Sequence, residues 1–186
     1  MRRILVLVGI ASLATLAATS AGAQAVTVLG GSQARLCAYA AQTGEDDIAS
    51  QAVCTNALTT EVLDPLDRAG TFVNRGVMKL RRKDFAGATA DFDAALQVKP
   101  DLGEAYLNRG AATLGARRFA ASIADLDRAL ALGVKEPEKA HFNRALAHEN
   151  LGQWEAALAD YARAIELRPE WQQPRTELAR LSVAPP

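Results

Sequence analysis

The residues of this chain best suited to chemistry are its two histidines, His141 and His148. They are seven positions apart, so on a helix they would share one face. Such a pair could exchange a proton or bind a metal ion. Zinc-binding histidines on a helix are instead four residues apart with a glutamate between them. Each of these histidines also stands where a repeated pattern has a bulky residue, so we interpret both as packing residues.

The acidic residues do not complete a catalytic site either. Asp91 with Asp93, and Asp125 with Asp127, are two residues apart on predicted helices, so the two members of each pair point in different directions. The chain has no serine nucleophile elbow, no glycine loop for a phosphate and no cysteine–histidine pairing. The sequence therefore predicts a protein that is not an enzyme and that binds no cofactor and no metal ion.

Residues 1–25 have the pattern of a secretory signal peptide. Basic residues at the start precede an uncharged apolar run from Ile4 to Ala18, and small residues then offer cleavage after Ala23 or after Ala25. The run is shorter than the ~20 residues that a membrane-spanning helix needs, although an uncleaved anchor is the alternative. No cysteine follows either cleavage position, so we do not expect a lipoprotein. We predict a secreted or periplasmic protein that is soluble after processing.

The charge of the chain excludes two classes of partner. Lysine and arginine together number 21, as do aspartate and glutamate, and removal of Arg2 and Arg3 with the signal peptide leaves 19 basic and 21 acidic side chains. A nearly neutral chain has no basic surface for nucleic acid. It also has no lysine and arginine block that would bind it to an anionic membrane.

Cys37 and Cys54 are the two cysteines of the chain. An even number in an exported protein favours a disulfide bond between them. A loop of this size would stabilise the fold by ~3 kcal/mol in the chain-entropy model. The alternative is a pair of buried thiols.

The dominant feature of the sequence is a pattern that occurs three times between Phe72 and Pro169. Asn-Arg-Gly or Asn-Arg-Ala begins at positions 74, 108 and 143, and Ala-Asp followed by a bulky residue begins at positions 90, 124 and 159. A period of 34 or 35 residues is typical of stacked supersecondary units. We predict an all-α solenoid whose units have helices at about 69–81 and 84–98, 103–116 and 119–132, and 138–151 and 154–167.

The flanking segments complete the predicted organisation. Residues 26–66 should contain a loose stretch at 26–32 and a helical hairpin broken at Thr43-Gly44, and Asn56-Ala57-Leu58 resembles the end of the later units. The hairpin is therefore a candidate for a degenerate repeat. Residues 67–170 hold the three units, at about 69–101, 102–136 and 137–170. Residues 171–186 should form a helix that covers the last unit, as solenoids require, and a tail.

The three units resemble tetratricopeptide repeats, with small residues where two helices approach closely and large residues beside them. The bulky slot holds Phe72, Tyr106 and His141, and the small slot four residues later holds Gly76, Gly110 and Ala145. In the second helices the slots hold Ala88, Ser122 and Ala157, then Phe92, Leu126 and Tyr161, then Ala95, Ala129 and Ala164. Two positions depart from the pattern: Val134 replaces the terminal proline of the second unit, and His141 replaces an aromatic residue.

The resemblance implies a groove for a protein partner. In tetratricopeptide proteins the first helices of the units line a concave face, and here that face is aliphatic with charged edges, which suits an amphipathic helix or an extended hydrophobic segment. The predicted groove residues are Val73, Val77, Leu80, Leu107, Ala111, Leu114, Lys139, Phe142, Leu146 and Asn150, with Arg81, Glu104 and Glu149 at the edges.

Some members of this family clamp a chaperone's C-terminal carboxylate with lysine and asparagine in the first unit. Val73 and Val77 stand in those two positions here, whereas Asn108 and Lys139 match the remainder and Asn143 replaces an arginine. The resemblance therefore implies an incomplete clamp and a different partner.

Arginine and aspartate also form two columns, Arg75, Arg109 and Arg144 opposite Asp91, Asp125 and Asp160. We interpret them as structural ion pairs that fix the register of the helices.

Two functions remain open at this point. The first is an adaptor or assembly factor of the bacterial envelope that binds a protein or peptide in the groove. The second is a self-associating structural module whose groove is filled by its own N-terminal hairpin, by the segment Val26 to Gly31 or by a second copy, because apolar grooves of this size rarely stay bare.

Overall fold

The computed structural model describes residues 23–183. Residues 1–22 of the predicted signal peptide, which spans residues 1–25, lie outside the described residues, as do the last three residues of the tail, whereas residues 23–25 are described. Within the described part the chain forms nine helices and no strand, which confirms the predicted all-α class. None of these helices is both long enough and apolar enough to cross a membrane.

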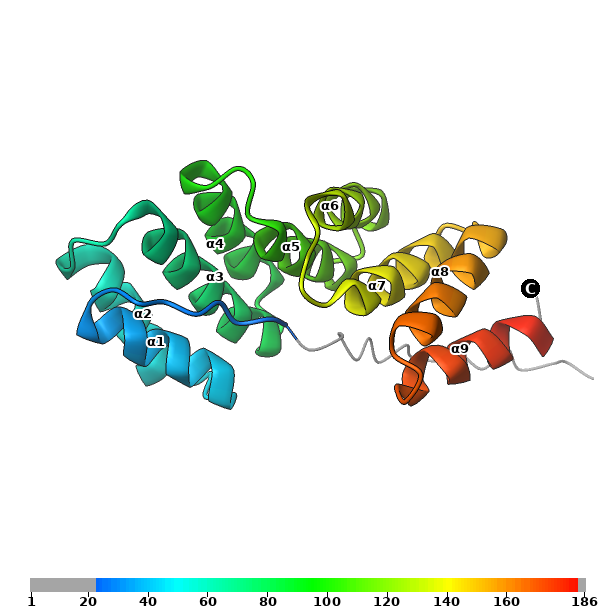
Figure 1. The fold of residues 1–186 in the computed structure, drawn as a ribbon, viewed down its shortest axis with the longest axis horizontal. Coiled ribbons are helices and arrows are strands. Elements are labelled where there is room, and N and C mark those ends of the chain that lie inside the picture. The colour runs from blue at the N-terminus through cyan, green and yellow to red at the C-terminus, as the bar shows by residue number, and fades with distance from the viewer. Residues whose placement is uncertain (1–22, 184–186) are drawn as a thin grey trace, which may run out of the picture.

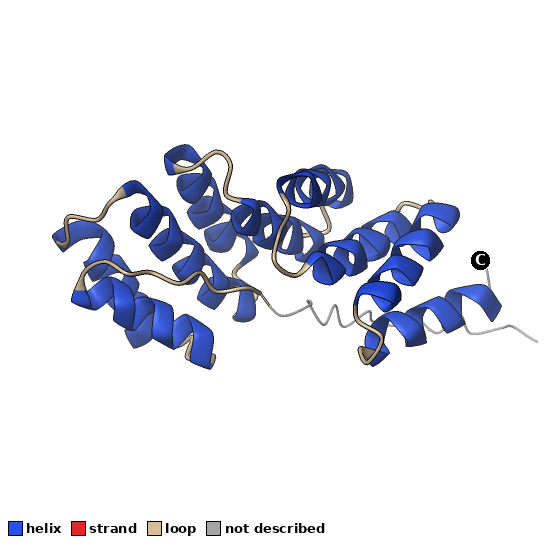
Figure 2. Ribbon diagram, in the orientation of Figure 1, coloured by secondary structure: helices blue, strands red, loops and turns tan. Residues whose placement is uncertain are grey.

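The helices form antiparallel hairpins that lie side by side along the long axis of the molecule (Figures 1 and 2), with α1 and α2 at one end and α9 at the other. Neighbouring hairpins pack through their first helices and through the second helix of one against the first helix of the next. The helices are α1 (Ser32–Thr43), α2 (Ile48–Thr60), α3 (Pro65–Arg81), α4 (Phe85–Val98), α5 (Gly103–Gly115), α6 (Phe119–Leu132), α7 (Pro137–Asn150), α8 (Trp154–Leu167) and α9 (Gln172–Val183).

Helix α3 begins one turn earlier than the sequence predicted, at Pro65 instead of residue 69. The Asp64 carboxylate accepts a hydrogen bond from the Asp67 amide and caps the helix, and Pro65 occupies the first turn, where its missing N–H is not needed. The predicted boundary between residues 66 and 67 therefore lies inside a helix, because Asp64 and Pro65 begin α3.

Packing within each hairpin follows the predicted pairing of small and large residues. A Cβ atom placed on Gly76 would lie 2.5 Å from a ring carbon of Phe92, and one on Gly110 would lie 2.7 Å from Leu126 Cγ. Phe92 and Leu126 are fully buried. In these two hairpins the first helix therefore approaches the second so closely that only glycine, which has no Cβ atom, fits between them.

The predicted columns of arginine and aspartate form ion pairs within each unit and also join neighbouring units. Arg75, Arg109 and Arg144 bind Asp91, Asp125 and Asp160 of their own unit at 2.6, 2.6 and 2.7 Å. Arg109 reaches back to Asp93 at 2.6 Å, and Arg144 reaches back to Asp127. Each such arginine therefore fixes the position of its hairpin relative to the preceding one.

The hairpin of α1 and α2 takes the place of a unit in this column. Arg75 reaches back to the hydroxyl of Thr55 on α2 at 3.0 Å, and Thr55 stands at the position held by Asp93 and Asp127 in later units. At the other end of the array this position is Ala162, and no further unit follows within the described residues. This column supports the interpretation of the hairpin as a degenerate repeat.

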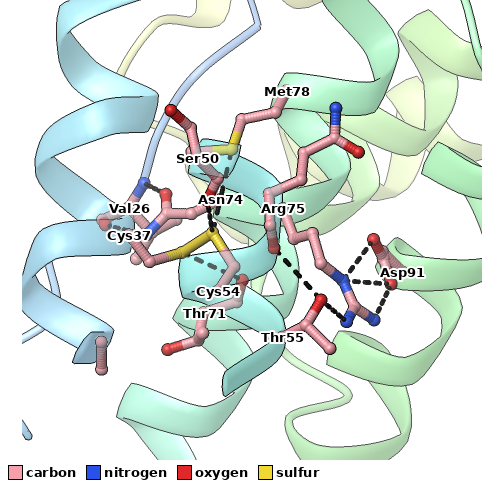
Figure 3. Close-up of a disulfide and its surroundings, with 12 residues drawn as sticks. Val26, Cys37, Ser50, Cys54, Thr55, Thr71, Asn74, Arg75, Met78 and Asp91 are labelled. Atoms are coloured by element: carbon pink, nitrogen blue, oxygen red, sulfur yellow. Dashed lines mark hydrogen bonds and ion pairs between the residues drawn. A yellow bond between two sulfur atoms is a disulfide. The ribbon is translucent and has the colours of Figure 1, made fainter. Parts of the chain in front are cut away.

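The predicted disulfide is present between Cys37 of α1 and Cys54 of α2. Both cysteines are fully buried, and the sulfur of Met78 on α3 lies 3.8 Å from that of Cys54. Figure 3 shows the bond between the two helices, next to Met78, Asn74 and Arg75 of α3. The bond therefore braces the first hairpin where it packs against α3.

Helix α9 covers the end of the array, as the sequence predicted. Trp171, just before it, packs its ring against Phe142 with centroids 4.8 Å apart. The Arg180 guanidinium binds the buried Glu149 carboxylate at 2.5 Å, and this carboxylate also accepts a hydrogen bond of 2.8 Å from the Tyr161 hydroxyl. The cap thus combines aromatic packing with a satisfied polar contact.

Candidate functional site

An extended segment, residues 24–29, crosses the first helices of the array and forms the centre of the candidate site; we call it the strap. The Val26 amide donates to Asn74 Oδ1 at 2.7 Å, and Asn74 Nδ2 donates to the Val26 carbonyl at 2.8 Å. Gln24 makes the same pair of bonds with Asn108, at 3.0 and 2.9 Å. Figure 1 shows this dark blue segment running from α1 across α3 towards α5. Two units thus hold the strap by its main chain.

The C-terminal half of the strap is anchored more firmly than its N-terminal half. The Leu29 amide donates to the buried Asp67 carboxylate at 2.9 Å, and the Val28 side chain is buried in a cluster with Ala34, Ala38 and Ala57. Val26 packs, only partly buried, against the core that contains Val73 and Val77. The sequence predicted a loose stretch at residues 26–32. The difference arises because the partners of the strap are asparagine and aspartate side chains far away in the chain.

A third asparagine, Asn143 on α7, occupies the same slot as Asn74 and Asn108. It is 1% exposed, and its Oδ1 has no hydrogen-bond partner. Gln24 Oε1 is the other buried side-chain oxygen without a partner in the described part of the chain. Buried carbonyl oxygens normally accept a hydrogen bond, so this end of the strap has unused acceptors.

The predicted groove residues divide into two groups. Four of them, Leu80, Ala111, Leu114 and Leu146, come together in an open pocket between α3, α5 and α7. Phe85 and Gly115 complete its apolar lining, and Arg81 and Lys83 supply cations. The Arg81 guanidinium donates to the carbonyl of Ala41 at 2.7 Å, and its burial lowers the pKa of this arginine. The strap does not line this pocket, and its four predicted groove residues are 3–7% exposed.

The other predicted groove residues lie elsewhere. Val73 and Val77 are fully buried in the core beneath the strap, and Leu107 and Phe142 are each 2% exposed. Phe142 packs between Tyr161 and Trp171 because in the last unit the capping segment covers this slot. Lys139 binds Glu136 at 2.8 Å, and the exposed Asn150 donates to the Leu146 carbonyl at the end of α7.

The two histidines lie on either side of one carboxylate, that of Asp160. His141 Nδ1 is 2.8 Å from Asp160 Oδ1, and His148 Nε2 is 3.9 Å from Asp160 Oδ2. Their side chains are 17% and 16% exposed. His141 stands where Phe72 and Tyr106 lie beside the corresponding arginines. Residues 23–183 contain no group of three or more histidine, cysteine, aspartate or glutamate side chains that could hold a metal ion.

The environment of Asp160 makes a pH-dependent contribution to stability. Burial by itself would raise the pKa of this carboxyl, but hydrogen bonds from Arg144 and His141 outweigh it, so the pKa lies below the ordinary 3.8. A carboxyl whose pKa is lowered in the folded state stabilises the fold at pH values above its pKa in the unfolded state. This stabilisation is lost as the pH falls through the pKa of the carboxyl in the folded state.

We therefore expect Asp160→Asn to lower the free energy of unfolding by about 2 kcal/mol at pH 7, since it removes a charged acceptor from Arg144. Urea unfolding at several pH values should show the difference from wild type shrinking below pH 3.8. Asp93→Asn, at a carboxylate that is 49% exposed, is the control and should cost about 0.5 kcal/mol or less. A difference that stays constant down to low pH would contradict this account.

The asparagine column is visible in the sequence, but its role is not. Asn74, Asn108 and Asn143 mark the repeat, and Asn108 also matches the incomplete clamp, whereas Asn143 departs from it. The signal available in the sequence was an amide at one slot of three successive first helices, facing the concave side, with no side-chain partner in its own unit.

The geometry defines the class of protein as an α-solenoid of stacked helical hairpins, with an extended chain held on the concave side. A family model described as tetratricopeptide repeat matches residues 138–170, the predicted third unit. No curated protein matches the chain. The third unit therefore matches a tetratricopeptide repeat, and the described chain has the fold of tetratricopeptide-repeat domains.

Several solved structures have the same fold. The Arabidopsis OM64 TPR domain is 24% identical with a TM-score of 0.61, over 63% of this chain and 97% of that one. MamA from Desulfovibrio magneticus RS-1 is 20% identical with a TM-score of 0.68, over 82% and 85%. The first TPR of Spaghetti (RPAP3), bound to the HSP90 peptide SRMEEVD, is 24% identical with a TM-score of 0.60, over 63% and 93%.

Proposed function

We propose that this protein is an exported interaction module of the bacterial envelope that holds an extended segment of another protein on its concave face. The observation that carries the proposal is the strap, because Asn74 and Asn108 each hold one of its residues through both the amide and the carbonyl. Such contacts depend on an extended main chain and are largely independent of side-chain identity. The predicted signal peptide and the disulfide support an oxidising compartment outside the cytoplasm.

The partner should differ from an acidic chaperone tail. The Spaghetti (RPAP3) domain binds an HSP90 peptide, but in this chain Val73 and Val77 replace the lysine and asparagine of the clamp and are buried. The neutral Asn143 also replaces the arginine of the clamp. An amide column of this kind suits an uncharged extended segment whose apolar side chains can enter the pocket at Leu80, Leu114 and Leu146.

A pull-down with the processed protein tests the proposal. The variant should combine Asn108→Ala and Asn143→Ala, because the Asn108 amide holds the strap and the Asn143 Oδ1 has no partner, whereas Leu107 and Phe142 pack in the core. Both asparagines are 1% exposed, so the melting curve of the variant must show that it folds. We expect recovery of the partner to fall at least tenfold, because up to four hydrogen bonds to its main chain are lost. Asn56→Ala, at an exposed asparagine of α2, is the matched control. Equal recovery with all three baits would refute the proposed binding face.

The second candidate function is self-association through the same face, which is favoured by the presence of the chain's own strap on it. Light scattering of the processed protein distinguishes the two. A monomer at micromolar concentration agrees with a module for other proteins, whereas a dimer that the two asparagine substitutions dissociate would show that the groove serves a second copy.

A further inference from the structure

The strap occupies the side-chain amides of Asn74 and Asn108, which in the proposed function would bind a partner. At Asn74 and at Asn108 the amide oxygen accepts from a strap N–H, and the amide nitrogen donates to the carbonyl of the same strap residue. A partner cannot make this pair of bonds while the strap makes it. Binding of the strap and binding of a partner at these two asparagines therefore exclude each other.

The two ends of the strap are held by contacts of unequal strength. Near α1 it is fixed by the buried Val28 side chain and by the bond from the Leu29 amide to Asp67. At the other end Gln24 has its two bonds to Asn108, but its side-chain Oε1 is buried without a partner. An unsatisfied buried carbonyl oxygen costs free energy, so the Gln24 end is the one that a competitor releases first.

The register of the strap points to Asn143 as the next contact. Val26 lies at Asn74 and Gln24 lies at Asn108, which gives two residues of extended chain per unit. In an extended chain, residues two apart share a face. The residue that follows this series at the third unit would present its N–H and C=O to Asn143, whose Oδ1 is buried and without a partner.

We propose that the strap is an internal competitor and that a partner's extended segment binds first at Asn143, then displaces Gln24 from Asn108. This inference rests on the proposed function and specifies its regulation. The partner segment runs in the same chain direction as the strap. Every second residue of the segment faces an asparagine and must donate its N–H, so proline is excluded from these positions. The neighbouring pocket at Leu114 and Leu146 takes one of its apolar side chains.

The test measures fluorescence polarisation of two labelled peptides. The short probe has the strap sequence Gln-Ala-Val-Thr-Val-Leu, and the long probe has the same sequence preceded by Ala-Gly-Ala, so that it reaches Asn143. The proteins are the processed chain that begins at Gln24, the product of cleavage after Ala23, and a variant that lacks residues 24–27 but retains the Val28 and Leu29 anchors. We expect the variant to bind the long probe at least tenfold more tightly than the processed chain does.

Two point variants make the test independent of the deletion. Val26→Pro removes the N–H that donates to Asn74 and should tighten binding of the long probe to the full processed chain about fivefold. Thr27→Pro is the matched control and should leave binding unchanged, because Thr27 is exposed and its amide makes no hydrogen bond within the described structure. Asn143→Ala in the deletion variant should weaken the long probe about tenfold and leave the short probe unchanged.

The outcomes separate the inference from the function on which it rests. Equal affinity of the processed chain and the deletion variant for the long probe would overturn the competitor role and leave peptide binding intact. If the deletion variant folds, as judged by its melting curve, and binds neither probe, the proposed function itself fails. A dimer in which two copies exchange their straps would overturn the inference, because the occupant would then be a second copy.

Discussion

Gly110→Leu should lower the free energy of unfolding by about 3 kcal/mol and the melting temperature by about 10 °C. A Cβ atom at this position would lie 2.7 Å from Leu126 Cγ and 3.4 Å from the Ser122 carbonyl oxygen. Neither neighbour has room to retreat, since both residues are fully buried and the Ser122 hydroxyl donates to the Gly110 carbonyl at 2.8 Å. Thermal unfolding followed by circular dichroism is the measurement.

The control for Gly110→Leu comes from the third unit. Ala145 occupies the same slot there, opposite Tyr161, so the architecture tolerates a methyl group in that unit. Ala145→Gly should cost about 1 kcal/mol or less, chiefly through the entropy of glycine in a helix. Unchanged melting of Gly110→Leu would show that the helices of a hairpin are not in the close contact described above.

Removal of the disulfide should lower the free energy of unfolding by about 3 kcal/mol, because the bond joins residues 17 positions apart and restricts the unfolded chain. The double variant Cys37→Ala and Cys54→Ala is preferred to serine, since both positions are fully buried and a hydroxyl there would need a partner. Urea unfolding with and without reductant gives the effect in the wild type, and the double variant should not respond to reductant.

The effect of losing the disulfide should also be local. The α1–α2 hairpin packs on α3, and the strap is anchored between them through Val28 and Asp67. Hydrogen exchange should therefore rise in α1, α2 and the strap more than in α7 and α8. A uniform rise along the chain, or no loss of stability on reduction, would contradict this assignment.

The elements that follow from local chemistry were predictable. The 34-residue period identified the three hairpins, because small and large residues such as Gly76 and Phe92 must meet at fixed positions. The partner of Cys37 also followed, from the number of cysteines and the predicted compartment. The ion pairs within units followed from the arginine and aspartate columns, but the bonds from Arg109 and Arg144 to the preceding units did not.

What the sequence did not reveal depends on contacts between distant segments. The segment from Val26 to Gly31 was one predicted occupant of the groove, and the structure places Val26 there. The bonds that hold the strap were not predictable, because it has no periodicity of its own and is ordered by Asn74 and Asn108, 48 and 84 positions away from its paired residues. Phe142 has the sequence environment of a groove residue, but Trp171 covers it because the third unit is the last. The unused oxygen of Asn143 becomes visible only when the other two asparagines are seen to hold a chain.

Ala162 leaves the last described hairpin without the acceptor that links each earlier hairpin to the next one. In each earlier hairpin an oxygen of Thr55, Asp93 or Asp127 accepts a hydrogen bond from the arginine of the following hairpin. The last described hairpin has the methyl group of Ala162 at the same position. An additional hairpin spliced in after α8 would bury its arginine without that acceptor, and so would the first unit of another molecule stacked end to end. Engineers who wish to lengthen this scaffold should therefore install Ala162→Asp before they duplicate a unit.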